Sequence, residues 1–591
     1  MGMQQQIQEA AINALQQLSG KPFTAKDFQI NKTKPEFEGD YTIVLFSLLK
    51  PLGKSPDALG NELGKFLLEH NAELFSSYNI IKGFLNLVVS DGYWTSVLSR
   101  NYNDVCFGTG AQKHKKVMVE YSSPNTNKPL HLGHLRNNFL GWSIAEIYKA
   151  NGYAIVKTCI VNDRGIHICK SMIAWQLFAN GATPQSTNTK GDHFVGDYYV
   201  KFNDEYKRQV EELISNGMDK ATAEKEAPIM KATQQMLLDW EAGKPDVMEL
   251  WKTMNSWVYA GFDETYKRIG SDFDKAYYES NTYLLGKKTV EEGLQKNVFV
   301  KKDDNSVWID LTADGLDEKI VQRKDGTSVY MTQDIGLAQQ KYEEYKIDES
   351  IYVIGDEQNY HMKVLQLICK KLGLPYADSI YHLSYGMVEL PTGKMKSREG
   401  TVVDADDLLN EMESVAQQKT EELGKVKDFT AEELKELYKT LSLGALKYYL
   451  LRVDPKKKMI FNPEESIDFH GHTGPFIQYT HARIKSILRK EKAQRNEVQE
   501  TPLLPLEKEL LITLESYPTI LDQACKEHDP SHIANYVYHL AKTYNSFYTE
   551  HSVMNAESEE KKQLRLLICE FTANVIAGAM QLLGISVPER M

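Results

Sequence analysis

The chain has 591 residues, 42% of them hydrophobic and 25% charged, which is ordinary for a globular protein but too long for a single core. No stretch has the uninterrupted apolar length of a membrane span and no export signal opens the chain, so we expect a cytoplasmic protein that does not enter a membrane. The formal net charge of −12 argues mildly against a nucleic-acid partner, although local basic patches decide this rather than the total.

Residues 1–110 have the pattern of a small α/β unit. Helical periodicity predicts three helices, over residues 4–18, 41–49 and 56–68. Residues 80–89 then read as one strand, which contains Phe84 and Asn86. On composition alone, a unit of this kind is a packing domain.

A strand, a turn and a helix follow one another at residues 116–141, and the rest of the chain is organised around them. Apolar residues alternate along the strand, and a loop rich in serine, asparagine and proline at 122–129 ends it. His131 and His134 lie three positions apart on the first helical turn, so they share a face beside N–H groups that have no helical partner. This end of a helix favours a phosphate, and Gly133 leaves room for a flat ring.

An isolated His-x-Gly-His pattern also fits a surface pair or an ordinary helix start. Its position at a strand-to-helix turn favours a functional site, because open α/β sheets bind nucleotides there. We predict the first half of such a sheet in residues 111–187 and the second half in 321–410. Residues 188–320 read as an insertion of charged helices between the two halves, with most charges on a solvated face.

Further polar residues lie at element ends in the second half. A short strand is predicted at 328–331, and Asp334 then fits the N-terminal cap of a helix. Gln358 follows a buried strand at 351–355. The six cysteines lack metal-binding spacing, so we read Cys159, His167 and Cys169 as core residues and expect no metal site.

A basic loop follows at residues 394–398, next to glycines, and taken alone it fits a solvated loop. Strand signals nearly vanish from about residue 411 onward. Amphipathic helices are predicted there over residues 441–451, 478–490, 505–521, 532–548 and 561–583. We therefore expect residues 411–591 to form an all-α bundle.

Together these motifs resemble class I aminoacyl-tRNA synthetases, and arginyl-tRNA synthetases in particular. The likeness rests on the HIGH-motif region at 122–136, on the KMSKS-like loop at 394–398, and on the bundle segments 474–483 and 582–591. It covers essentially the whole chain. It implies an α/β fold, with a Rossmann-like class I catalytic domain, an N-terminal α/β addition that binds tRNA and a C-terminal all-α anticodon-binding bundle.

The resemblance also implies a reaction. The enzyme would be a ligase that uses ATP, with Mg²⁺, to convert arginine into arginyl-adenylate, and it would pass arginine to the 3′-terminal ribose of its tRNA. The implied partners are arginine, ATP and the tRNA for arginine, and we expect a monomer. Two other readings stay open. A small-molecule nucleotidyltransferase would share the histidine chemistry but would not need the bundle, and a non-catalytic RNA-binding relative would not need both histidines and Lys394.

The family's functional residues carry over onto matching positions. The resemblance assigns ATP binding to His131, Gly133, His134, Lys394 and Ser397. Of these, it makes the two histidines and Lys394 catalytic as well. Arginine binding falls to Glu120, Asn125, Tyr330, Asp334 and Gln358, since selecting a guanidinium calls for a carboxylate with flanking acceptors. tRNA binding falls to Phe84, Asn86, Gln478 and Tyr479.

The KMSKS-like loop departs from the family pattern, because Ser397 stands where a second lysine is usual. A serine cannot supply positive charge, so another cation must offset the charge that builds as pyrophosphate departs. We predict that Lys128, three residues before His131, is this catalytic cation. Lys396 is the rival, and a third reading makes Lys128 an ordinary solvated lysine.

Overall fold

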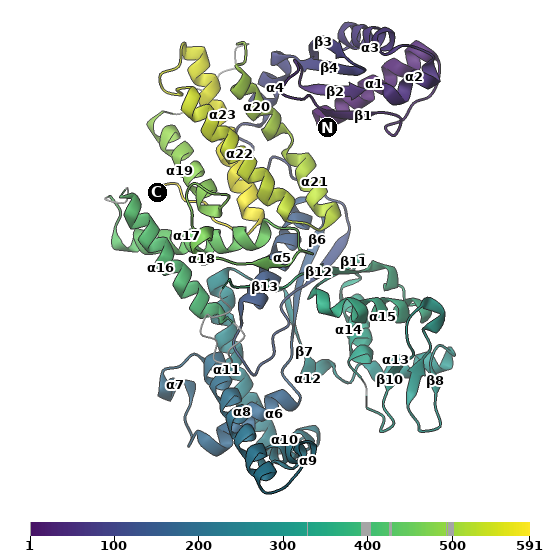
Figure 1. The fold of residues 1–591 in the computed structure, drawn as a ribbon, viewed down its shortest axis with the longest axis vertical. Helices are drawn as coiled ribbons and strands as arrows, with labels where there is room; N and C mark the ends of the chain where they lie inside the picture. The colour runs from purple at the N-terminus through teal and green to yellow at the C-terminus, as the bar shows by residue number, and fades with distance from the viewer. Residues whose placement is uncertain (1, 328, 392–402, 425–427, 492, 494–500) are drawn as a thin grey trace.

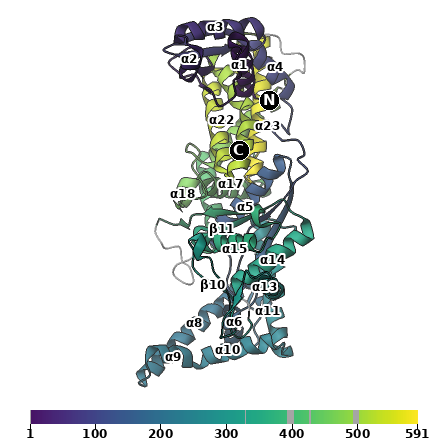
Figure 2. The same cartoon turned by 90° about the vertical axis from the view of Figure 1, so that its right-hand side faces the viewer.

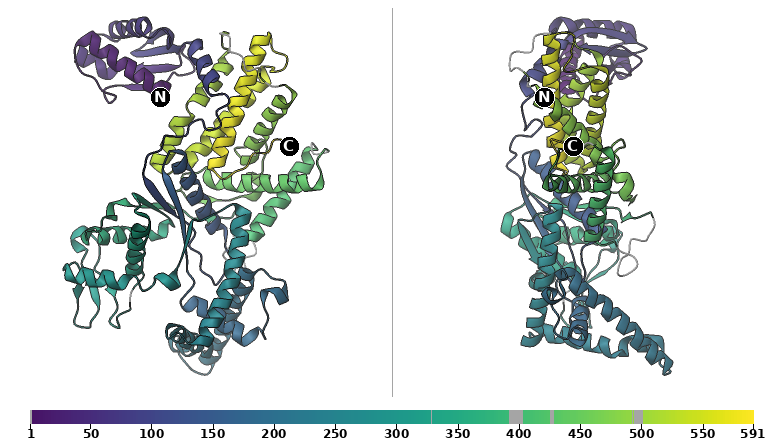
Figure 3. Two further views of the ribbon diagram at one scale, coloured as in Figure 1. Left: turned by 180° about the vertical axis from the view of Figure 1, so that it is seen from behind. Right: turned by 90° about the vertical axis from the view of Figure 1, so that its left-hand side faces the viewer.

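The computed structural model describes residues 2–327, 329–391, 403–424, 428–491, 493 and 501–591, and the structural statements below concern these ranges. The molecule is elongated (Figures 1 and 2). A small N-terminal unit lies beside a helical bundle, a parallel sheet lies below the bundle, and the helices of residues 191–269 extend to the far end. The C-terminus lies against the bundle (Figure 3). None of the described helices is long and apolar enough to cross a membrane.

The N-terminal unit is an antiparallel sheet with helices, in the strand order β1-β2-β4-β3. Its strands are β1 (Gln29–Lys32), β2 (Tyr41–Val44), β3 (Phe75–Ile81) and β4 (Phe84–Val89). Its helices are α1 (Met3–Ser19), α2 (Phe46–Leu52), α3 (Pro56–His70) and α4 (Asp91–Asn101). The helices predicted at 4–18 and 56–68 are therefore confirmed by α1 and α3.

Two predictions in this unit are only partly right, since residues 46–49 belong to α2 and residues 84–89 to β4. The start of the helix predicted at 41–49 is strand β2, because Thr42, Ile43 and Val44 are β-branched and pair with β1 and β4 on either side. The single strand predicted at 80–89 is two: residues 80–81 end β3, residues 84–89 are β4, and a hairpin turn separates them. Lys82 and Gly83 form that turn with φ of 50° and 84°, values that a continuous strand cannot contain.

Five parallel strands form the central sheet, in the order β12-β11-β5-β6-β7 (Figure 1). They are β5 (Lys116–Glu120), β6 (Ala154–Val161), β7 (Lys275–Tyr278), β11 (Glu349–Gly355) and β12 (Ile380–Tyr385). Strand β7 belongs to the stretch 188–320, which therefore supplies an edge strand of this sheet as well as helices. The helices before it are α6 (Ile166–Phe178), α7 (Pro184–Thr187), α8 (Gly191–Ser215), α9 (Lys220–Glu226), α10 (Pro228–Glu241) and α11 (Pro245–Ile269).

A smaller lobe follows β7, built on the antiparallel order β10-β9-β8. Its elements are α12 (Glu279–Thr282), α13 (Gly286–Gln295), β8 (Val300–Lys301), β9 (Val307–Ile309), β10 (Lys319–Gln322), α14 (Tyr330–Tyr345) and α15 (Asn359–Lys371). The strand predicted at 328–331 is wrong for its described residues, since α14 already begins at Tyr330. Its first turn closes through the hydrogen bond from the Thr332 N–H to the Val329 carbonyl at 3.0 Å.

The C-terminal part is helical apart from a two-residue strand, β14 (Met459–Ile460), paired with β13 (Val388–Glu389). Its helices are α16 (Ala405–Leu423), α17 (Ala431–Leu451), α18 (Pro463–Ser466), α19 (Gly474–Lys490), α20 (Pro505–Glu515), α21 (Tyr517–Glu527), α22 (Ser531–Glu550) and α23 (Glu559–Leu582). The all-α bundle is confirmed. The helix predicted at 505–521 is two helices, because Pro518 lacks the N–H that would continue α20.

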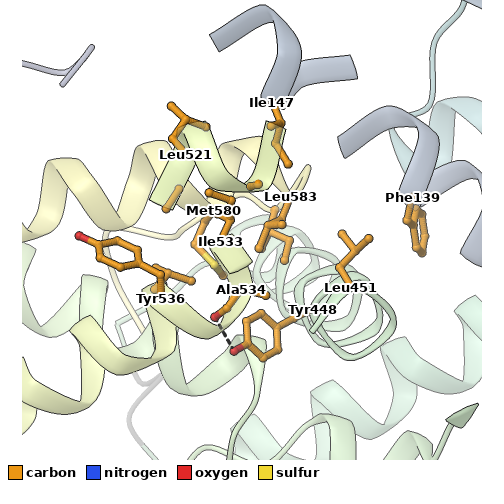
Figure 4. Close-up of a cluster of buried hydrophobic side chains, with 14 of the residues drawn as sticks. Phe139, Ile147, Tyr448, Leu451, Leu521, Ile533, Ala534, Tyr536, Met580 and Leu583 are labelled. Atoms are coloured by element: carbon orange, nitrogen blue, oxygen red, sulfur yellow. Dashed lines mark hydrogen bonds between the residues drawn. The ribbon is translucent and has the colours of Figure 1, made fainter. Parts of the chain in front are cut away.

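Helix α5 (Leu132–Ala150) lies between the sheet and the bundle. A Cβ at Gly141 would lie 2.3 Å from Tyr121, so the glycine allows α5 to approach the chain just beyond β5 closely. On its other side, Phe139 and Ile147 belong to the hydrophobic core that includes Leu451 of α17 and Leu583 (Figure 4). The helix that begins with the two histidines is thus buried on two faces, which holds its first turn in place.

Candidate active site

Two histidines open helix α5 beyond the carboxyl end of β5. His131 is the N-cap residue, and its Nδ1 accepts a hydrogen bond from the Gly133 N–H at 3.1 Å. The His131 N–H donates to Nδ1 of His134 at 3.1 Å, and the two ring centres are 3.8 Å apart. Since each Nδ1 accepts, the proton of each neutral ring lies on Nε2. Both rings therefore carry an Nε2–H donor, and no backbone group of the described residues accepts a hydrogen bond from it.

The surroundings keep these rings neutral. Burial lowers the pKa of His131 to about 4, with Lys128 lowering it further and Asp404 opposing. Burial, His131 and Lys128 hold the pKa of His134 well below its ordinary value. Lys128 is therefore close enough to both rings to act on their charge. A Cβ at Gly133 would lie 3.0 Å from Cε1 of His131, so this glycine makes room for the His131 ring itself.

The chain before the KMSKS-like loop is held by Arg136, on the second turn of α5. Its guanidinium is fully buried and donates to the carbonyl oxygens of Gly386, Met387, Pro455 and Lys457, the last at 2.9 Å. The sequence analysis did not single out Arg136. Five donors on one rigid plane can hold several carbonyls at once, which ties α5 to the segments around 386 and 456.

The chain after the loop is held by the first turn of α5. The Leu132 N–H donates to the Val403 carbonyl at 2.9 Å, and the Ala405 N–H donates to the Leu130 carbonyl at 3.0 Å. The two histidines are therefore flanked by chain from both sides of the loop. Lys394, Lys396 and Ser397 themselves lie outside the described residues.

Of the predicted arginine ligands, Glu120 is buried at the end of β5. Its carboxylate forms an ion pair with Lys341 of α14, which is also buried. The Lys341 ammonium lies 4.9 Å from the ring centre of Tyr352 and 5.5 Å from that of Tyr277. The sequence analysis missed Lys341, because it looks like one of many helix lysines. Asn125 is exposed, and its backbone forms an isolated parallel β-bridge with Asn162, which follows β6.

The other predicted arginine ligands lie around the start of α14 and the end of β11. The Asp334 carboxylate is 2.7 Å from Nε2 of His361, and its side chain is 40% exposed. Tyr330 is 70% exposed and Gln358 is exposed as well. These side chains are open to solvent and available to a ligand.

A second carboxylate, Glu279, accompanies Asp334, and the sequence analysis missed it. Burial raises the pKa of Glu279 to about 7, with Asp163 and Asp334 adding to the shift and Arg164 opposing it. The neighbouring Ser280 is fixed by Asp163, whose Oδ1 accepts the Ser280 N–H at 2.8 Å. The available signal was position, since Glu279 follows β7 directly and so lies at the carboxyl end of a sheet strand.

Two of the predicted tRNA ligands, Asn86 and Gln478, are buried amides. Asn86 is 1% exposed, accepts from the Thr42 hydroxyl at 2.6 Å and donates to Asn79. Gln478 is fully buried and donates to the carbonyls of Thr440 and Ser586. Both amides hold elements of the fold together, and their contact with tRNA stays a prediction.

The other two predicted tRNA ligands belong to accessible aromatic groups. Phe84 packs edge-to-face with Phe46, which is 51% exposed. Tyr479 lines a cavity of about 380 Å³ with Arg483 and Tyr548. The Arg483 guanidinium lies 4.9 Å from the Tyr479 ring centre and 5.1 Å from that of Tyr548. Further cations line this cavity, namely Arg489, Lys490 and Arg590. Aromatic faces beside cations suit an unpaired base and its phosphate.

Known protein families match this chain over nearly its whole length. The model "tRNA synthetases class I (R), catalytic domain" matches residues 96–462. The models "Arginyl tRNA synthetase N terminal domain" and "DALR anticodon binding domain" match residues 5–89 and 477–591. The chain belongs to the class I arginyl-tRNA synthetase family. Membership accounts for a parallel sheet joined to a helical bundle, and it leaves no need for the small-molecule nucleotidyltransferase reading.

Individual members of the arginyl-tRNA synthetase family are similar over their full length. The arginine–tRNA ligase of Flavobacterium psychrophilum is 54% identical over 605 positions, covering 100% of both chains. That of Bacteroides fragilis is 51% identical over 598 positions with the same coverage. The structure of Thermus thermophilus arginyl-tRNA synthetase is similar with a TM-score of 0.78 and 25% identity over 100% of both chains. The Plasmodium falciparum synthetase shares the fold, at a TM-score of 0.77 and 18% identity.

Proposed function

We propose that this arginine–tRNA ligase activates its amino acid at the first turn of α5. The observation that carries the proposal is the pair of neutral histidines whose Nδ1 atoms are held by backbone N–H groups, which leaves two Nε2–H donors at a helix N-terminus. In the reaction, the arginine carboxylate attacks the α-phosphorus of ATP. A bond forms from carboxylate oxygen to phosphorus, the bond to the bridging oxygen breaks, and pyrophosphate leaves.

The histidines would donate hydrogen bonds to phosphate oxygens as negative charge shifts toward the leaving group. This is catalysis by positioning and electrostatics, and it requires no covalent enzyme intermediate. A neutral donor suits the task, because it strengthens its hydrogen bond as charge develops without first losing a proton to the phosphate. Mg²⁺ would arrive with the ATP phosphates as part of the substrate.

Arginine would lie with its guanidinium near Asp334 and its amino-acid end near Glu120 and Asn125. Two carboxylates close enough to affect each other, Asp334 and Glu279, suit a planar cation with five donors. Tyr330 and Gln358 would supply flanking acceptors. Glu120 already faces the ammonium of Lys341, so it would accept the substrate ammonium as a second cation.

The cation that replaces the missing loop lysine would be Lys128. Its support is that it lowers the pKa of both His131 and His134, which places its charge beside the donors that face the phosphates. Single-turnover adenylate formation separates it from the rival. Lys128→Met should slow the step by more than about tenfold, or roughly 1.4 kcal/mol, whereas a smaller loss together with a far larger loss in Lys396→Met would assign the role to Lys396.

The tRNA would contact the aromatic pair of the exposed Phe46 and the half-buried Phe84, and the basic cavity around Tyr479 and Arg483. These sites lie on the N-terminal unit and on the bundle, so a long ligand would span both. The monomeric state and the cytoplasmic location stay predictions. ATP–pyrophosphate exchange, measured with and without arginine and with and without tRNA, tests the whole proposal: exchange that does not depend on arginine would refute it.

A further inference from the structure

A largely buried cluster of charged side chains joins two helices beside His131. It consists of Lys190, Asp192 and His193 at the start of α8 and of Asp404 and Asp406 at the start of α16, and we call it the junction cluster. Lys190 Nζ lies 3.1 Å from Asp192 Oδ2 and 2.6 Å from Asp406 Oδ2. His193 Nε2 lies 3.3 Å from a carboxylate oxygen of Asp404 and 3.3 Å from one of Asp406. Neither contact has hydrogen-bond geometry, so His193 interacts with both carboxylates as an ion pair. The proposed chemistry uses none of these side chains.

The charges of this cluster compensate one another. Burial alone would lower the pKa of His193, but Asp404 and Asp406 outweigh it and raise that pKa to about 10. Burial opposes ionisation of both carboxyls as well, yet His193 holds the pKa of Asp404 and of Asp406 below its ordinary value. Arg268 of α11 adds a further cation 3.8 Å from Asp406. The ammonium of Lys190 already fills the place where a metal ion would bridge Asp192 and Asp406.

Asp404 connects the junction cluster to the reaction centre. One of its carboxylate oxygens, Oδ1, accepts the N–H groups of Asp406 at 2.9 Å and Asp407 at 3.1 Å and so caps α16, while Oδ2 faces His193. Its backbone forms an antiparallel bridge with His131, within the hydrogen bonds of Leu132 and Ala405 described above. Asp404 is bonded to Ala405, the Ala405 N–H donates to the Leu130 carbonyl, and Leu130 is bonded to His131. This short path links the junction cluster to the first histidine proposed to donate to a phosphate.

We propose that the junction cluster positions His131 for adenylate formation, so that its members are positioning residues of the reaction. The direction of the His131 Nε2–H depends on the N-cap backbone, and that backbone is paired with the Asp404 segment. A displacement of about 1 Å in a catalytic group is enough to cost a hundredfold in rate. Removing one partner from a largely buried charge network leaves the others uncompensated, which displaces the segment. The proposal rests on the proposed role of His131.

Asp406→Asn tests this, because it removes one charge with almost no change in shape. We expect kcat for adenylate formation to fall by about tenfold or more while the KM for arginine changes by less than about twofold. Lys190→Arg should keep most of the activity, and Lys190→Met should not. Glu212→Gln is the matched control, since it breaks an ion pair with Arg208 on the same helix α8, where both side chains are 61% exposed, and it should leave the rate unchanged.

A double-mutant cycle with His131→Asn separates positioning from general loss of structure. If the cluster acts through His131, Asp406→Asn should cost little further rate in single-turnover adenylate formation once His131 is gone. An equal cost in both backgrounds, or no cost in the wild-type background, would overturn the proposal. A wild-type rate for His131→Asn alone would instead refute the proposed function of that histidine. If Asp406→Asn does not fold, His193→Gln enters the same cycle.

Discussion

Acid should weaken the first turn of α5 through His131, and His131→Asn should remove that effect. Asparagine is a good N-cap, so the variant keeps an acceptor for the Gly133 N–H but has no ring to titrate. The folded-state pKa of about 4 lies below the ordinary 6.5, so the unfolded state binds more protons between these values. The contribution of His131 to stability is therefore complete above pH 6.5 and is lost as the pH falls toward 4.

The same two pKa values set the size of the effect. Between pH 7 and pH 5 the loss integrates to about 2 kcal/mol for this one ring. Hydrogen–deuterium exchange of peptides covering residues 130–150 reports the opening free energy of α5 locally, which avoids the assumption that a chain of several domains unfolds in one step.

Between pH 7 and pH 5, the opening free energy of α5 should fall by about 2 kcal/mol less in His131→Asn than in the wild type. His114, an exposed loop histidine, provides the matched control, and His114→Asn should behave as the wild type. The reasoning is refuted if His131→Asn and wild type lose equal protection of α5 on acidification, because the ring would then be charged in the folded enzyme and could not serve as a neutral donor.

Other perturbations have equally definite outcomes. Lys341→Met should lower the opening free energy of α14 by roughly 3–5 kcal/mol in hydrogen–deuterium exchange of peptides covering residues 330–345, since it leaves the buried carboxylate of Glu120 without its cation, and adding Glu120→Gln should restore most of that loss. Asp334→Asn should reduce kcat/KM for arginine by a factor equivalent to roughly 2–5 kcal/mol, with little change in the KM for ATP. Wild-type arginine kinetics in this variant would show that Asp334 is not part of the arginine pocket. Arg483→Met should weaken tRNA binding and reduce its salt dependence by about one phosphate contact, whereas an unchanged salt slope would show that no phosphate reaches this cavity.

Local signals in the sequence were enough to predict the part of the site that one helix carries. The position of His131 and His134 at the N-terminus of a helix follows from the strand, the loop and the helical period around them. All three signals lie within about thirty residues of sequence. Where local signals failed, a neighbouring strand or a proline decided the outcome. Residues 41–44 form a strand because strands β1 and β4 lie on both sides of them, and 505–521 divides into two helices at Pro518.

The partners of the charged and amide groups were decided only by the tertiary structure. Glu120 meets Lys341 across 221 positions, and Asp334 and Glu279 approach each other from α14 and the end of β7, so no window of sequence contains either pair. Gln478 reads as a surface residue of an amphipathic helix, yet it is buried because α17 and the C-terminal segment close over it. Periodicity and capping are properties of single turns of chain, whereas burial and charge pairing depend on which distant elements the sheet and the bundle bring into contact.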